Sequence, residues 1–126
     1  MRAVDTNVLV RLITRDDAKQ VAAAEAFVSS GAWVSQLALV EATWVLDTVY
    51  ERGSDAIALA VEMLLNHQHL TVQDADAVTA AVDQFRRRPS ISFSDCLMVE
   101  VARKAGHGPL GTFDRSLGKV DGAVRI

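Results

Sequence analysis

The sequence predicts an α/β domain of three layers, α/β/α, in which helices cover both faces of a short, mostly parallel sheet. Two observations predict this fold. Short apolar runs alternate along the chain with longer segments in which apolar residues recur every three to four positions, the spacing of an amphipathic helix. Strands that alternate with helices are joined by right-handed crossovers, and such crossovers make neighbouring strands parallel.

Five short segments have the length and the apolar, partly β-branched composition of strands. They are 2–4, 32–35, 70–73, 110–113 and 123–126, the last as an edge strand. Each of the first four is followed by residue types that begin helices or turns, so the chain is expected to leave the sheet at these points.

Polar residues and glycines mark the ends of the helices. A first helix is expected to end near Thr14, and a second to start at Asp16 and Asp17 and to end at Gly31, because Asp caps helix N-termini and Gly follows C-termini. The later helices are expected at 36–52, 54–65, 74–88 and 94–105, with Gly53 closing the first of them, Ser54, Asp74 and Ser94 capping the others and Gly106 ending the last. A short helical turn is expected at 115–118.

Length and composition indicate one globular domain, residues 1–126, with half of the residues apolar. No apolar run reaches the roughly 18 residues that span a bilayer, and no signal-peptide segment precedes the first strand, so the cytoplasm is the expected location. The single cysteine, Cys96, is expected to be a small core residue, because it has no partner for a disulfide or a zinc site. A net charge of −3 argues against broad electrostatic binding of nucleic acid but allows RNA to bind around a cation.

Four acidic residues interrupt apolar segments at positions where a parallel fold would bring them together. They are Asp5, Glu41, Asp95 and Asp114. Sites in open parallel sheets form beyond the carboxyl ends of the strands, where Asp5 and Asp114 lie. Helix capping or a turn would also explain Asp5, Asp95 and Asp114.

Glu41 is harder to explain by local structure. It falls on what looks like the apolar face of the helix at 36–52, and a glutamate is seldom buried there without a partner. The positions that define this face are Leu37, Val40, Trp44, Val45 and Thr48.

Clustered carboxylates cannot all stay charged unless a cation neutralises them. Oxygen ligands without a nearby His or Cys set favour Mg²⁺ or Mn²⁺ over zinc, and such a cation can activate a water molecule for phosphodiester cleavage. Four polar residues could hold the carboxylates and waters in place, namely Thr6, Asn7, Ser35 and Thr112.

With these residues the chain resembles a PIN domain of the toxin type found in VapBC toxin–antitoxin pairs, over essentially its whole length. The resemblance lies in four segments, Val4-Asp5-Thr6-Asn7-Val8-Leu9, Val34-Ser35-Gln36-Leu37 with Val40-Glu41-Ala42, Phe93-Ser94-Asp95-Cys96-Leu97, and Thr112-Phe113-Asp114-Arg115. It implies a Mg²⁺- or Mn²⁺-dependent endoribonuclease, in which Asp5 and Asp95 are the most direct metal ligands and Thr112 supports the acids.

The resemblance further implies a homodimer and a cognate VapB-type antitoxin, whose C-terminal segment occupies the cleft and whose N-terminal part binds operator DNA. Arg115 and Ser116 stand where some members carry a further acid, which leaves a second metal position open. A non-catalytic PIN-like binding module and a processing nuclease that is not a toxin stay as alternatives. An aspartyl phosphatase is disfavoured, because Asn7 occupies the position of its second Asp.

Overall fold

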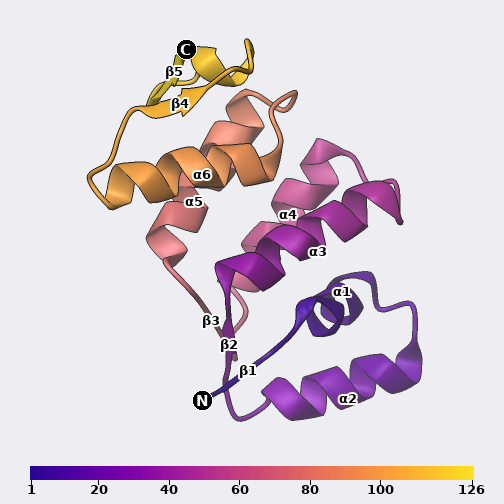
Figure 1. The fold of residues 1–126 in the computed structure, drawn as a ribbon. Coiled ribbons are helices and arrows are strands. Elements are labelled where there is room, and N and C mark those ends of the chain that lie inside the picture. Colours follow the sequence, from indigo (N-terminus) through magenta and orange to yellow (C-terminus); the bar gives the residue numbers. More distant parts are fainter. The chain divides into compact units, whose positions relative to one another are not determined.

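The computed structural model describes residues 1–126, which form two compact units, Met1–Ala75 and Asp76–Ile126 (Figure 1). The first unit contains a three-stranded sheet and the second a two-stranded sheet. Every strand pair is parallel. The predicted α/β class with parallel pairing is therefore confirmed. None of the helices combines the length and apolar character that a membrane crossing requires.

The first unit builds its sheet in the order β1-β2-β3 and surrounds it with four helices. The strands are β1 (Arg2–Ala3), β2 (Ala32–Val34) and β3 (Leu70–Val72), and the helices are α1 (Thr6–Thr14), α2 (Ala18–Val28), α3 (Gln36–Thr48) and α4 (Ser54–Leu65). Helix α1 packs against both α2 and α3. Leu9 of α1 and Leu39 and Leu46 of α3 are fully buried in this core.

Several predicted boundaries in this unit are wrong. Ser35 does not belong to β2 but caps α3, with extended backbone angles and its Oγ accepting a hydrogen bond from the Ala38 N–H at 3.1 Å. Helix α3 ends at Thr48 and not at residue 52, and α2 ends three residues before Gly31. Gly53 caps α4 and Ser54 is its first residue, so no side chain satisfies the amides at this helix start.

The predicted buried face of α3 is also wrong. Leu37 and Trp44 are 69% and 53% exposed, and Glu41 is exposed beside them. The buried positions are instead Ala38, Leu39, Ala42, Thr43 and Leu46. Apolar residues occur nearly all round this helix, so periodicity could not choose between its faces. Small residues such as Ala38 and Ala42 let the backbone of α3 approach its neighbours closely, and the structure buries that face.

The second unit contains two helices, two short strands and a short 3₁₀ helix. They are α5 (Ala75–Arg87), α6 (Phe93–Lys104), β4 (Leu110–Thr112), η1 (Leu117–Lys119) and β5 (Ala123–Arg125). Phe85 of α5 and Phe93 of α6 pack edge to face, with ring centroids 6.0 Å apart. Ser92, and not Ser94 as predicted, caps α6, because its Oγ accepts the Asp95 N–H at 3.2 Å. Gly106 ends α6 as predicted: its N–H bonds to the Arg103 carbonyl and the next N–H, of His107, to the Ala102 carbonyl.

A close contact joins the turn before β5 to α6. The Arg103 guanidinium bonds to the Asp121 carbonyl at 2.8 Å. Gly122 has φ +94°, and a Cβ added there would lie 2.5 Å from an Arg103 guanidinium nitrogen and 2.9 Å from a Val99 methyl carbon. A side chain at position 122 would therefore meet both an unfavourable backbone conformation and two packed neighbours.

Gly122→Ala is expected to lower the free energy of unfolding by roughly 2–4 kcal/mol, from the left-handed backbone and the overpacking together. The matched control is Gly106→Ala, since Gly106 also has positive φ (+81°) but no atom within 4 Å of an added Cβ. That variant should lose only the backbone cost, about 1–2 kcal/mol. Thermal unfolding of both variants and the wild type measures the difference, and equal losses would show that the Arg103 contact adapts freely.

Candidate functional site

Asp5 lies two residues beyond the end of β1 and caps α1. Its Oδ1 accepts a hydrogen bond from the Val8 N–H at 3.1 Å, and its backbone is extended, as an N-cap requires. The side chain is exposed. The capping interpretation is therefore correct for one carboxylate oxygen, and the other is directed to no protein donor and can bind a ligand.

Glu41 reaches the same helix start from α3. The Thr6 hydroxyl, one residue after Asp5, donates to Glu41 Oε2 at 2.8 Å. This bond joins residues 35 positions apart in the sequence. It places Glu41, like Asp5, at the N-terminus of α1. The expectation that Glu41 is buried on an apolar face is wrong, because the face that carries it is exposed. Glu41 is instead a solvent-accessible carboxylate that a hydroxyl orients.

A groove of about 380 Å³ opens beside Asp5 between α1 and α2. Its lining is mostly apolar and consists of Asp5, Asn7, Val8, Arg11, Gln20, Ala23, Ala24 and Phe27. Asn7 thus lies next to Asp5 on an accessible surface and has no role in the core.

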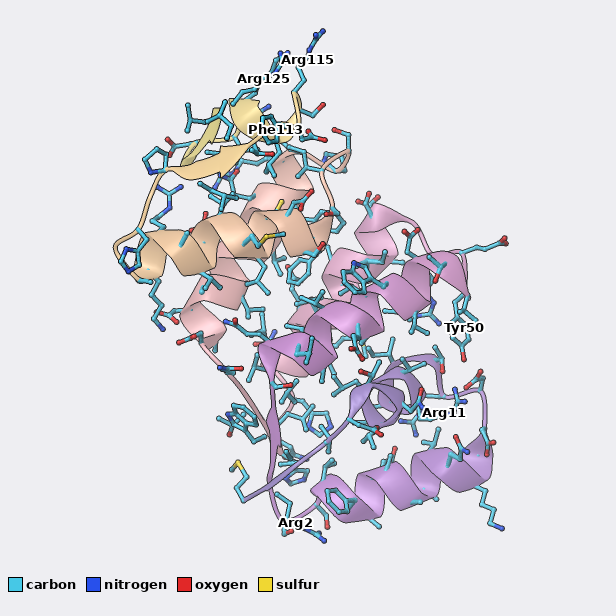
Figure 2. The ribbon with its side chains drawn as sticks, in the orientation of Figure 1. Arg2, Arg11, Tyr50, Phe113, Arg115 and Arg125 are labelled. Atoms are coloured by element: carbon cyan, nitrogen blue, oxygen red, sulfur yellow. The ribbon has the colours of Figure 1, made fainter.

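Arg11 is held at the wall of this groove by a hydrogen-bond network. Its guanidinium donates to the Tyr50 hydroxyl at 3.0 Å and pairs with Asp16 at 3.1 Å (Figure 2). The Tyr50 hydroxyl in turn donates to Asp16 at 2.8 Å, and this bond, with one from Thr14, lowers the pKa of the Asp16 carboxyl. The Arg11 Nε also donates to Gln20 Oε1 of α2 at 2.5 Å. The positive charge of Arg11 is thus fixed in one position by partners from three segments.

In the second unit, Asp95 occupies the first turn of α6 and is partly exposed. Its backbone N–H is the group that Ser92 caps, so the carboxylate itself does not carry the cap. A carboxylate in this position benefits from the positive end of the helix dipole. Cys96, the next residue, is buried, and burial raises the pKa of its thiol to about 11. The complete burial of Cys96 confirms it as a core residue, and its thiol stays protonated at neutral pH.

Asp114 lies two residues beyond β4, as Asp5 does beyond β1. Its backbone N–H donates to Thr112 Oγ1 at 3.0 Å, and its Oδ1 accepts the Leu117 N–H at 2.7 Å. Thr112 therefore supports the turn that presents Asp114. The exposed carboxylate again uses one oxygen for a turn and keeps the other accessible.

The structure thus places the predicted residues in two groups. Unit 1 brings together Asp5, Thr6 and Glu41, and unit 2 joins Thr112 to Asp114. Neither unit by itself gathers three or more His, Cys, Asp or Glu side chains in a metal-binding arrangement. Ser35 makes no contact with an acid; it acts through α3, whose start it caps and whose second turn carries Glu41.

The donors in both groups are carboxylate oxygens with hydroxyl groups beside them. This chemistry fits a hard cation such as Mg²⁺ or Mn²⁺ and does not fit a zinc site, which takes mostly His and Cys ligands.

One exposed residue next to an acid was not recognised from the sequence. Phe113 was predicted to end the fourth strand, but the strand ends at Thr112 and the ring is 81% exposed. Arg115 follows on the other side of Asp114 and is also exposed. The sequence signal that could have revealed this exposure is an aromatic residue placed between the end of a strand and an acidic turn.

The sequence was compared with protein families, curated proteins and solved structures. Residues 2–123 match the sequence profile of the PIN domain family. Among solved structures, the chain is similar to VapC20 of Mycobacterium tuberculosis, described as a toxin that cleaves the sarcin-ricin loop, with 23% identity and a TM-score of 0.44 over 90% of this chain and 88% of that one. No curated protein matches the sequence significantly.

Proposed function

Because this chain belongs to the PIN domain family, we propose that it is an endoribonuclease that depends on Mg²⁺ or Mn²⁺, and that it is the VapC-type toxin of a type II toxin–antitoxin system. The observation that carries the nuclease proposal is the arrangement of Asp5, Thr6 and Glu41. Asp5 caps the start of α1, the hydroxyl of the next residue, Thr6, binds Glu41 from a distant part of the sequence, and both carboxylates are accessible to solvent. The cap explains one oxygen of Asp5, but Glu41 is exposed and adds nothing to the core, and a cation would relieve the repulsion between carboxylates placed at this helix start.

In this proposal Asp5, Glu41, Asp95 and Asp114 bind the cation, with Asp5 and Asp95 as the most direct ligands. A bound Mg²⁺ or Mn²⁺ would neutralise the carboxylates, polarise the scissile phosphate and favour the ionised form of a nearby water. The proposal that all four acids bind one cation rests on the family resemblance and on ligand chemistry. Two carboxylates alone supply few of the ligands that such a cation takes. The proposed domain is then a single one, residues 1–126, of which the family match covers 2–123.

The protein's own contribution is to hold these groups. Thr6 donates to Glu41 and leaves its second oxygen accessible, the α1 amide of Val8 holds Asp5, and Thr112 fixes the turn of Asp114. Asn7 and Ser35 support the same constellation, Asn7 beside Asp5 in the groove and Ser35 as the cap of α3. In the proposed reaction a water oxygen forms a bond to phosphorus, the bond to the leaving ribose oxygen breaks, and that oxygen takes up a proton.

The partners follow from the toxin assignment. We propose a homodimer in the cytoplasm and a VapB-type antitoxin whose C-terminal segment covers the proposed metal ligands. Operator DNA is then bound only through the antitoxin. Two competing functions are a PIN-like module without activity and a processing nuclease that is not a toxin. The accessible pair of Asp5 and Glu41 favours an active nuclease over the inert module.

The purified protein is expected to cleave single-stranded or loop RNA with Mg²⁺ or Mn²⁺ and to lose this activity in EDTA, because unneutralised carboxylates repel a phosphodiester. End-labelled RNA resolved on a gel measures the cleavage, and added Mn²⁺ should restore it. An Asp5→Asn protein purified in parallel controls for contaminating ribonuclease. Cleavage that persists after exhaustive chelation would refute the metal mechanism, and equal cleavage of DNA of the same sequence would refute the ribonuclease assignment.

A further inference from the structure

The ring of Phe113 is presented to solvent directly beside Asp114. It is the most exposed large apolar side chain of the protein, at 81%. Isolated exposed apolar residues are common on protein surfaces, so exposure alone carries no function. Phe113 differs from such residues in its position, because it immediately precedes Asp114, a proposed metal ligand, in the turn at the end of β4.

Hydrogen bonds make this turn a fixed platform. The backbone of Asp114 is held on both sides, its N–H by Thr112 Oγ1 at 3.0 Å and its carbonyl by the Gly118 N–H at 3.0 Å. Gly118 lies against Arg125, where an added Cβ would approach the Arg125 Cβ to 2.8 Å. The turn is therefore packed tightly against β5 while the Phe113 ring stays uncovered. A ring on such a platform loses little conformational entropy when it binds a flat partner.

Two arginines come from the same β4-η1-β5 segment as the ring. Arg115 follows Asp114, and Arg125 is the register partner of Thr112 in the β4-β5 pair. Both are exposed, and neither guanidinium takes part in an ion pair within the protein. Figure 2 shows Phe113, Arg115 and Arg125 projecting from the β4-η1-β5 segment at the C-terminal end of unit 2. In a chain of net charge −3, two uncompensated guanidinium groups beside an acid form a local cationic surface.

We propose that Phe113, Arg115 and Arg125 form the RNA platform of this enzyme: Phe113 stacks on one unpaired base, and the two arginines contact the phosphates on either side of it. The inference rests on the proposed function, which it extends to the way in which the substrate is held. Base stacking on an aromatic ring together with guanidinium contacts to the backbone is how proteins hold single-stranded nucleic acid. The platform would therefore select unpaired RNA over duplex and tolerate different bases, because every base has a face that can stack.

A protein partner fits this surface less well. The larger apolar side chains of the β4-β5 pair, Val124 and Ile126, alternate with Arg125 along β5 and so lie on the opposite face of the pair from it. A protein interface would be expected to use these apolar side chains, whereas the proposed platform offers a single ring with two cations. Val124→Ala is consequently a matched control, since it removes apolar surface from the same strand but not from the platform.

The first experiment measures binding of a short single-stranded RNA that contains 2-aminopurine, using full-length protein with Asp5→Asn so that the RNA stays intact. Adding Phe113→Ala is expected to weaken binding roughly 5- to 100-fold and to abolish the fluorescence quenching that stacking produces. Phe113→Tyr should preserve both, and Val124→Ala should change neither. Because the ring is exposed, thermal unfolding should be unchanged by Phe113→Ala and Phe113→Tyr.

The second experiment measures the salt dependence of the same binding. Arg115→Gln and Arg125→Gln are each expected to reduce the slope of log affinity against log salt concentration by about 0.7, the value for one phosphate contact on a single strand. Lys104→Gln is the control. It removes a charge at the C-terminal end of α6, where Lys104 pairs with Asp76 at 2.7 Å, and should leave the slope unchanged.

Two sets of results would overturn the inference in distinguishable ways. If the wild type cleaves RNA and Phe113→Ala binds and quenches as before, the nuclease stands and the platform is wrong. The same holds if the Phe113→Ala change alters self-association, measured by gel filtration, and leaves RNA affinity intact, because the ring then contacts protein. If the wild type neither cleaves nor binds RNA, the proposed function fails and the platform fails with it.

Discussion

Asp5→Asn is expected to lower RNA cleavage by about two orders of magnitude or more while leaving the fold intact. Asparagine caps helices as well as aspartate does, so its side-chain oxygen can still accept the Val8 N–H that Asp5 Oδ1 accepts at 3.1 Å. The substitution therefore keeps the shape and the cap and removes only the negative charge. Loss of a direct ligand charge exceeds the 10- to 100-fold cost that is typical of removing a supporting residue around a metal.

Asp17→Asn is a closely matched control for this variant. Asp17 caps α2 in the same way, accepting the Gln20 N–H at 3.0 Å, but is not among the proposed ligands. Its variant should retain wild-type cleavage and a similar unfolding temperature. Cleavage of labelled RNA and thermal unfolding are measured in parallel for both. Wild-type rates in Asp5→Asn would show that Asp5 is only a helix cap and that the site lies elsewhere.

Production of this protein in bacteria without its antitoxin is expected to stop growth, with viable counts falling by orders of magnitude. Uncontrolled cleavage of an essential RNA acts catalytically, so a few active molecules per cell suffice. The Asp5→Asn variant should relieve the arrest at equal protein levels, because it keeps the folded surface and loses the activity. Colony counts after induction measure the effect, with immunoblots to confirm the amounts.

Asp17→Asn is again the control. It changes a helix cap but no proposed metal ligand, so it should remain toxic if RNA cleavage causes the arrest. Harmless expression of a protein that cleaves RNA efficiently in the test tube would favour the processing nuclease over the toxin. Arrest that persists in Asp5→Asn would point instead to aggregation or to a binding effect that needs no chemistry.

Features that depend on neighbouring residues could be predicted from the sequence. The N-cap of α2 at Asp17 and the glycine end of α6 at Gly106 depend on hydrogen bonds within a few residues, and both are confirmed. Asp5 and Asp114 were placed beyond strand ends because the apolar run stops just before each, and the structure has both there. The cap of α6 is an exception, because the sequence predicts Ser94 and the structure uses Ser92.

Properties that depend on distant residues were decided only by the tertiary structure. The sequence by itself determined that strands and helices alternate, that the pairing is parallel and where the acids stand along the chain. It did not determine that the small-residue face of α3 is buried, which leaves Leu37, Glu41 and Trp44 exposed. Nor did it determine the Thr6 to Glu41 bond or the exposure of Phe113. Spacing along a helix marks which residues share a face, but the neighbouring elements decide which face is covered, and they are chosen by packing over the whole unit.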